Sequence, residues 1–120
     1  MKSTAVVLLN YNGLKLLKKF LPVAIKNSKN ATIFIIDNGS TDDSVLWTKA
    51  TYPNVECIVL DSNKGYAGGY NEGLKNIKAE IYALVNTDVE LTLNWLPTLL
   101  NRFYSNSETV VVQPHILNYN

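Results

Sequence analysis

Four apolar runs along the chain each stop at a cluster of Asn and Asp residues. The clusters begin about 25 residues apart, an interval that accommodates one strand, one helix and two short loops. If the runs are parallel strands, every cluster lies at the carboxyl edge of one sheet, where open α/β sheets bind ligands. The four runs, each with the polar residue that follows it, are 5–9 (Asn10), 33–36 (Asp37), 58–60 (Asp61) and 81–85 (Asn86).

The apolar runs are nearly continuous instead of alternating, which indicates strands that are buried on both faces. The segments between them have helical periodicity, as in the spacing of Leu14, Leu17 and Leu21. We therefore predict an α/β fold: a Rossmann-like, mostly parallel sheet with helices on both faces and right-handed crossovers. A fifth strand is expected from Thr109 to Gln113.

Local signals predict where the helices begin and end. Pro22 should kink the first helix or split it in two. Ser40 or Thr41 can cap the second helix, which should stop before Pro53 because a residue preceding proline favours extended geometry. Asn94 can cap the fourth helix. The third helix is expected to carry Ala67, Tyr70, Leu74 and Ile77, and the fourth to bury Trp95, Leu96, Leu99, Leu100 and Phe103.

Composition sets bounds on the class of protein. A chain of 120 residues, 47% of them hydrophobic, is long enough for one domain with a core. The net charge of +1 gives no strong field that would favour nucleic acid. Cys57 is the single cysteine, which excludes an internal disulfide and indicates a buried thiol. The N-terminus lacks a signal peptide's apolar length, so we expect a cytoplasmic protein whose lysine-rich first helix faces solvent.

The polar clusters at the predicted sheet edge offer the chemistry of a nucleotide site. Their amides supply donors and acceptors, and Tyr11 adds a flat ring that can stack on a base. Lys64 lies beside Gly65 and Gly68, at a strand-to-helix turn whose backbone N–H groups can approach a diphosphate closely. The glycine spacing matches neither a P-loop nor a dinucleotide fingerprint. The polar residues concerned are Asn10, Asn12, Asp37, Asn38, Asn63 and Asn86.

Asp88 follows the fourth apolar run, two residues after Asn86 and two before Glu90. Oxygen ligands on a tight turn suit Mg²⁺ or Mn²⁺, which needs few protein carboxylates when a diphosphate completes its coordination shell. The alternative is that Asp88 caps the helix that follows, but the other polar clusters at this edge favour metal or nucleotide binding. Whether Glu90 faces the same site stays open.

Four segments in order cover nearly the whole chain: 6–13 (VVLLNYNG), 35–42 (IIDNGSTD), 63–73 (NKGYAGGYNEG) and 84–90 (LVNTDVE). Together they resemble the family 2 glycosyltransferases, nucleotide-sugar enzymes of GT-A fold. The pair Asn86 and Asp88 stands where metal-dependent GT-A enzymes usually have Asp-x-Asp, which is similar to the rhamnosyltransferase-like branch.

The resemblance implies a role for each cluster. The residues matching Asn10 and Tyr11 line the base pocket, and the carboxylate matching Asp37 contacts the nucleoside. The segment 63–73 borders the nucleotide sugar, with Asn71 facing the cleft.

The resemblance also implies that Asp88 holds a divalent metal bridging the diphosphate, with Asn86 in place of a first carboxylate. Such enzymes invert the anomeric centre by in-line displacement while a base deprotonates the acceptor hydroxyl. The family carries that base on a later segment, so we expect it after Asn120 and expect His115 to be structural or exposed. Residues 1–120 would then be the donor-binding part of a single domain that continues past Asn120. A glycan or lipid-linked acceptor, and peripheral contact with the inner face of a membrane, are further expectations.

Two other classes of protein compete with the transferase. A nucleotidyltransferase would need a Gly- and basic-rich loop after the first strand, whereas residues 10–13 contain one Gly and no Arg. A non-catalytic nucleotide-binding module is favoured by the Asn at position 86. Among the aromatic residues, Trp47 and Trp95 are expected in the core, whereas Tyr66 and Tyr70 beside the glycines can serve as sugar platforms.

Overall fold

Strands and helices alternate along the chain, as the sequence pattern predicts. The computed structural model describes residues 3–106, 108, 111–113 and 117. The elements, in chain order, are β1 (Thr4–Asn10), α1 (Leu14–Lys26), β2 (Thr32–Asp37), α2 (Ser44–Thr51), β3 (Glu56–Val59), α3 (Gly65–Leu74), β4 (Ile81–Asn86) and α4 (Trp95–Tyr104).

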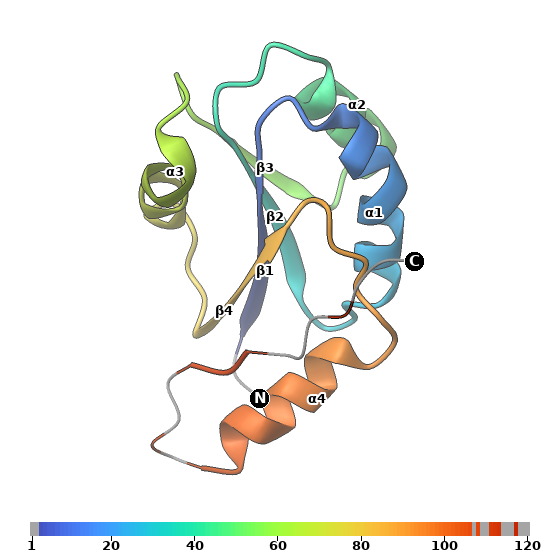
Figure 1. Ribbon diagram of the computed structural model, residues 1–120, viewed down its shortest axis with the longest axis vertical. Helices are drawn as coiled ribbons and strands as arrows, with labels where there is room; N and C mark the ends of the chain where they lie inside the picture. Colours follow the sequence, from blue (N-terminus) through green and yellow to red (C-terminus); the bar gives the residue numbers. More distant parts are fainter. Residues whose placement is uncertain (1–2, 107, 109–110, 114–116, 118–120) are drawn as a thin grey trace.

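The four strands form one parallel sheet in the order β3-β2-β1-β4 (Figure 1). The register places Asn10 of β1 beside Asp37 of β2, and Leu9 of β1 beside Asn86 of β4. The polar clusters that follow these strands therefore meet at one edge of the sheet, and the predicted parallel arrangement is confirmed.

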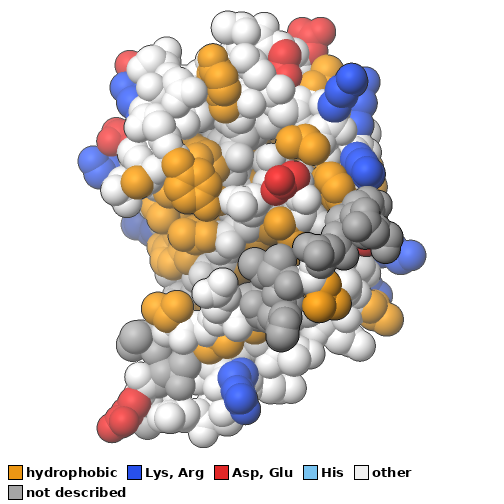
Figure 2. All heavy atoms as spheres, viewed as in Figure 1, with side chains coloured by type: hydrophobic (Ala, Val, Ile, Leu, Met, Phe, Trp, Pro, Cys, Tyr) orange, Lys and Arg blue, Asp and Glu red, His pale blue; other side chains and the backbone are white. Residues whose placement is uncertain are grey.

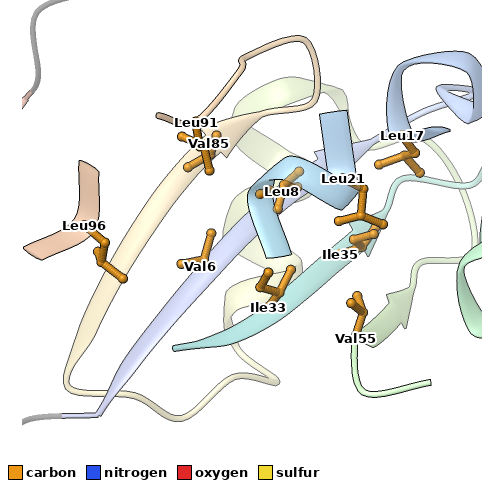
Figure 3. Close-up of a cluster of buried hydrophobic side chains, with 11 residues drawn as sticks. Val6, Leu8, Leu17, Leu21, Ile33, Ile35, Val55, Val85, Leu91 and Leu96 are labelled. Carbon is orange, nitrogen blue, oxygen red and sulfur yellow. The ribbon is translucent and has the colours of Figure 1, made fainter. Parts of the chain in front are cut away.

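Two hydrophobic clusters cover opposite faces of the sheet, so the prediction of helices on both faces is confirmed. One lies under α1 and α2, extends to Leu96 of α4, and also includes Val6, Leu8, Leu17, Leu21, Ile33 and Ile35 (Figure 3). The other lies under α3 and consists of Ala5, Val7, Ile36, Leu60, Tyr70 and Ile77. The alternation along β1 explains the pattern, because successive side chains of a strand point to opposite faces.

Burial on both faces holds for the central strands and fails for β4 at the edge of the sheet. Tyr82 and Leu84, on its α3 side, are 42% and 52% exposed. Figure 2 shows hydrophobic side chains gathered at the surface in this region, beside α3 and β4. An edge strand has a neighbour on one side only, so an apolar sequence there does not guarantee cover.

α1 is one continuous helix that contains Pro22, so the alternative that Pro22 splits it is wrong, while a kink at Pro22 stays a prediction. Proline removes one backbone hydrogen bond from a helix. Burial of Leu17, Phe20, Leu21 and Ala24 on the inner side of α1 offsets that loss.

α2 begins at Ser44, later than the predicted caps. The Ser40 hydroxyl donates to Asp37 Oδ1 and the Thr41 amide donates to Asn12 Oδ1, so both residues are held in the preceding loop. The predicted end is confirmed, since α2 stops before Tyr52, which has the extended angles φ −130° and ψ 76°.

α3 and α4 also differ in detail from the prediction. α3 ends at Leu74, which leaves Ile77 buried but outside the helix. Asn94 occupies the cap position of α4 with a φ of 64°, and its side chain makes no capping hydrogen bond. Only Leu96 of the predicted apolar stripe is buried, because α4 lies near the amino ends of the strands and not across a sheet face (Figure 1).

The predicted fifth strand is not seen where the structure describes it. Val111, Val112 and Gln113 are not in a strand, and Thr109 and Val110 lie outside the described residues, as does His115. Across the described ranges, none of the helices has the length and apolar character that crossing a bilayer requires.

Gly73 allows α3 to pack closely on the sheet. A Cβ at this position would lie 2.4 Å from Cδ1 of Ile36 and 2.6 Å from its Cγ1 and Cγ2. Gly73→Ala is therefore expected to lower the free energy of unfolding by about 1–3 kcal/mol, measured by urea denaturation. Gly68→Ala in the same helix is the control, because its Cβ would approach only Lys64, at 3.2 Å. Equal stability of the two variants would contradict the packing role of Gly73.

Candidate functional site

Asn10 and Asp37 form a buried hydrogen-bond network below the carboxyl edge of the sheet. Both side chains are 1% exposed. Asp37 Oδ1 accepts from Asn10 Nδ2 at 2.9 Å and from the Ser40 hydroxyl at 2.7 Å, while Asp37 Oδ2 accepts from the Ser40 amide at 2.9 Å. Asn10 Nδ2 also donates to Ser44 Oγ at 2.9 Å. Both carboxylate oxygens of Asp37 therefore already accept hydrogen bonds from protein groups at the carboxyl edge of the sheet.

Asn12 fastens the loop after β1 to the loop before α2. It has a φ of 50°, in the left-handed region that Asn tolerates. Its Oδ1 accepts from the amides of Thr41 and Asp42 at 2.7 and 3.2 Å, and its own amide donates to Ser40 Oγ at 2.8 Å. Asn12 thus supports the loops from outside the cleft.

Asp42 completes this support at the start of α1. Its Oδ2 accepts from the Leu14 amide at 3.1 Å, and its Oδ1 accepts from the amide and hydroxyl of Ser44. Burial raises the pKa of Asp42, but these hydrogen bonds outweigh it and hold the pKa below its usual range.

Asn38 joins the loop after β2 to the start of α3. It is 3% exposed, its Oδ1 accepts from the Lys64 amide at 2.9 Å, and its Nδ2 donates to Asn63 Oδ1 and to the Gly65 carbonyl. Gly65 has a φ of 77°, where other residues are strained. The amide side chain of Asn38 therefore fixes the turn that precedes α3.

A cleft of about 450 Å³ opens above this network, between the start of α3 and the loops after β1 and β4. One part of its wall is apolar or aromatic, and the other part carries amides, a hydroxyl and a carboxylate. The lining residues are Leu9, Tyr11, Leu16, Asn38, Asn63, Gly65, Tyr66, Asn86, Thr87 and Asp88.

The cleft brings together half of the residues predicted from the sequence. Tyr11, Asn38, Asn63, Gly65, Asn86 and Asp88 line it. The others that were predicted do not, namely Asn10, Asn12, Asp37, Lys64, Gly68 and Asn71. Their direct contact with a nucleotide sugar stays a prediction.

Sequence reasoning missed the apolar wall and Thr87. Leu9 is the last apolar residue of β1, and Leu16 lies on the exposed side of α1. One signal in the sequence could have identified Leu16, because this residue departs from the lysine pattern on that side of the helix. Thr87 lies between Asn86 and Asp88, so it shares their turn. Tyr66 lines the cleft, whereas Tyr70 is 4% exposed and belongs to the core.

The charge of the cleft comes from one side chain. Of the described residues that line it, Asp88 is the sole charged one. The Lys64 ammonium instead contacts the carboxylate of Asp61 at 2.8 Å. That hydrogen bond lowers the pKa of Asp61 and raises the pKa of Lys64. A diphosphate in the cleft would therefore need its charge neutralised by something other than a lining lysine or arginine.

A divalent cation fits this donor set. Within the described ranges, no group of three or more His, Cys, Asp or Glu side chains could hold a metal ion on its own. Mg²⁺ and Mn²⁺ bind through one or two carboxylates when substrate phosphates supply further oxygens. Asp88 is a suitable single carboxylate for that arrangement.

Comparison with known proteins agrees with the fold. The chain is 26% identical over 108 residues to Protein RfbJ of Shigella flexneri, covering 90% of this chain and 81% of the relative. The fold is similar to the mannosyltransferase PcManGT from Pyrobaculum calidifontis, solved with GDP-Man and Mn²⁺, at 19% identity and a TM-score of 0.72. It is also similar to S. aureus TarS 1-349 solved with UDP-GlcNAc, at 19% identity and a TM-score of 0.70.

The two solved structures are much longer than this chain. The match to PcManGT covers 82% of this chain and 31% of that one, and the match to TarS covers 85% and 32%. The chain thus spans about a third of each, and the shared part has the GT-A fold. A family model described as Glycosyl transferase family 2 matches residues 5–119, so the chain belongs to the family 2 glycosyltransferases.

Proposed function

We propose that this chain is the donor-binding part of a glycosyltransferase that takes a sugar from a nucleoside diphosphate. The observation that carries the proposal is the composition of the cleft. It has an aromatic and apolar wall, a series of amide groups and a single carboxylate, Asp88. A nucleotide sugar presents a base to stack, hydroxyls to bind and a diphosphate whose charge a metal can neutralise.

Each part of the donor has a matching part of the cleft. The ring of Tyr11, which is 51% exposed, and the side chains of Leu9 and Leu16 form a surface for the base. The start of α3, at Gly65 and Tyr66, turns the positive end of the helix dipole toward the cleft, which favours an anion, while the Gly65 amide itself donates to Asn63 Oδ1 at 2.8 Å.

Asp88 is proposed as the protein ligand of Mg²⁺ or Mn²⁺. Such a cation, when bound, would stabilise the negative charge that develops on the departing nucleoside diphosphate. The chain's own contribution is to hold the carboxylate at the end of β4, beside the first turn of α3.

Several finer parts of the proposal come from the family. We propose transfer with inversion to a hydroxyl of a glycan or lipid-linked acceptor, in a pathway of polysaccharide synthesis. The base and the acceptor site are proposed to lie on chain after Asn120. The Asn at position 86 supports placement in the rhamnosyltransferase-like branch, and the protein is proposed to act in the cytoplasm or at the inner face of a membrane.

A titration of the 120-residue chain with nucleotide sugars tests the proposal. UDP-, dTDP- and GDP-sugars and the corresponding nucleoside triphosphates, each with and without Mn²⁺, are compared by calorimetry. We expect one of the nucleoside diphosphate sugars to bind weakly and only with the metal, and we expect the chain to show no turnover. Preference for a nucleoside triphosphate would instead support a nucleotidyltransferase. Absence of binding in every arm would reject the donor site, and multiple turnovers would contradict its separation from the catalytic base.

A further inference from the structure

Two tyrosines of α3 fasten that helix to the end of β4. Tyr66 donates its hydroxyl hydrogen to Asn86 Oδ1 at 3.0 Å, and Tyr70 donates to the carbonyl of Val85 at 3.1 Å. The two rings pack edge to face, with centroids 5.2 Å apart and an interplanar angle of 76°. Tyr70 is buried, whereas Tyr66 is 64% exposed and lines the cleft together with Asn86.

The hydrogen bond from Tyr66 determines which end of the Asn86 amide is available to a ligand. Asn86 Oδ1 accepts from Tyr66, while Asn86 Nδ2 has no hydrogen-bond partner among the described residues. An amide nitrogen is a donor only and cannot coordinate a cation. The free end of Asn86 therefore suits an oxygen acceptor of the ligand and not a metal ion.

We propose that Tyr66 is a positioning residue that holds Asn86 as a hydrogen-bond donor to an oxygen of the nucleoside diphosphate, which leaves Asp88 as the only side-chain ligand of the metal. This inference rests on the proposed function. It assigns different partners to the two residues of the Asn86-x-Asp88 motif: Asn86 binds the nucleotide directly, and Asp88 binds it through the cation.

Charge explains why an amide suits position 86. Asp88 already places one carboxylate in a cleft whose described lining contains no lysine or arginine. A second carboxylate, at position 86, would repel the diphosphate wherever the cation did not lie between them. An amide held by Tyr66 contributes a hydrogen bond without adding charge.

Asn86→Asp gives the first test, because the two possible roles of residue 86 predict opposite results. The best-binding nucleoside diphosphate is titrated against the chain with and without Mn²⁺. Loss of the amide donor and addition of a negative charge are expected to weaken binding by about 10-fold or more in the presence of Mn²⁺. Tighter Mn²⁺-dependent binding by Asn86→Asp would show residue 86 to be a metal ligand and overturn the inference.

Tyr66→Phe gives the second test, because it removes one hydroxyl and keeps the ring. We expect binding of the nucleoside diphosphate in the presence of Mn²⁺ to weaken by about 3- to 10-fold, while the Mn²⁺ concentration that gives half-maximal binding stays unchanged. In an Asn86→Ala background the same change should have no effect, because the amide that it positions is absent. Tyr104→Phe is the matched control: Tyr104 is an exposed tyrosine on α4 that does not line the cleft. An equal loss in both backgrounds would overturn the inference.

A measurement without ligand separates this inference from the proposed function. The side-chain amide signals of Asn86 in ¹⁵N-labelled protein are expected to shift in Tyr66→Phe and to stay unchanged in Tyr104→Phe. If the wild-type chain binds no nucleotide, the proposed function fails and the ligand assigned to Asn86 fails with it. If the wild-type chain binds and the Tyr66→Phe affinity and amide signals are unaltered, only the positioning role fails.

Discussion

Replacing Asp88 by alanine is expected to abolish the metal-dependent part of nucleotide-sugar binding. Among the described residues, Asp88 is the only charged side chain that lines the cleft, so no second lining carboxylate can take its place. Removal of a sole protein ligand should weaken Mn²⁺-dependent binding by on the order of 100-fold. Calorimetric titration of the donor with and without Mn²⁺ measures this loss, and the two curves for Asp88→Ala should coincide.

The fold should survive this substitution, because Asp88 is exposed on a turn. Glu56→Ala is the matched control for net charge, since Glu56 is an exposed carboxylate at the amino end of β3, at the opposite edge of the sheet. The control should keep both its donor affinity and its dependence on Mn²⁺. Retention of metal-dependent binding by Asp88→Ala would place the cation elsewhere and remove the metal assignment.

The sheet and its functional edge could be predicted because both follow from one repeated pattern. An apolar run of about five residues that ends in Asn or Asp indicates a buried strand with a polar end, and β1, β2 and β4 follow it. Parallel pairing then brings the strand ends together, whatever the details of the helices. Tyr11, Asn86 and Asp88 line one cleft for that reason.

The orientation of individual polar side chains could not be predicted from the same pattern. Asn10 and Asp37 end their strands, as Asn86 does, yet both face inward. The difference lies in the loop before α2, where Ser40 and Ser44 supply the hydroxyl and amide partners that a buried carboxylate and amide require. Spacing along the chain does not show which polar groups will satisfy one another in this way.

The missed helix boundaries have a related cause. Ser40 and Thr41 are good capping residues, but tertiary hydrogen bonds to Asp37 and Asn12 compete for them. The half-buried stripe of α4 reflects the position of that helix near the end of the sheet, which its own periodicity does not encode. Local patterns therefore predicted that these helices exist but not where they begin or how deeply they pack.

Asp37→Ala is expected to cause the largest loss of stability among the polar substitutions considered. It would leave the Ser40 amide and hydroxyl without their acceptor and remove one hydrogen-bond partner of Asn10. These groups surround a residue, Asp37, that is only 1% exposed, so water cannot readily replace the lost partner. Loss of such buried partners should lower the free energy of unfolding by about 2–4 kcal/mol. Urea denaturation followed by circular dichroism measures the change. Asp43→Ala is the control, because Asp43 is exposed and makes no side-chain capping bond, and it should change stability by less than about 0.5 kcal/mol.

Asp37→Asn separates a supporting role from direct contact with the nucleoside. The amide keeps the shape and one acceptor oxygen, but it turns an N–H₂ group toward either the Ser40 amide or Asn10 Nδ2, which are both donors. We expect a smaller loss of stability than in Asp37→Ala. The affinity for the nucleotide sugar should fall only to the extent that the loops around Asn12 and Asn38 become less ordered. If Asp37→Asn is as stable as the wild type but loses donor affinity, then the carboxylate contacts the nucleoside, as the family resemblance implies. The buried network argues for the first outcome, because each oxygen of Asp37 already has a protein donor within 2.9 Å.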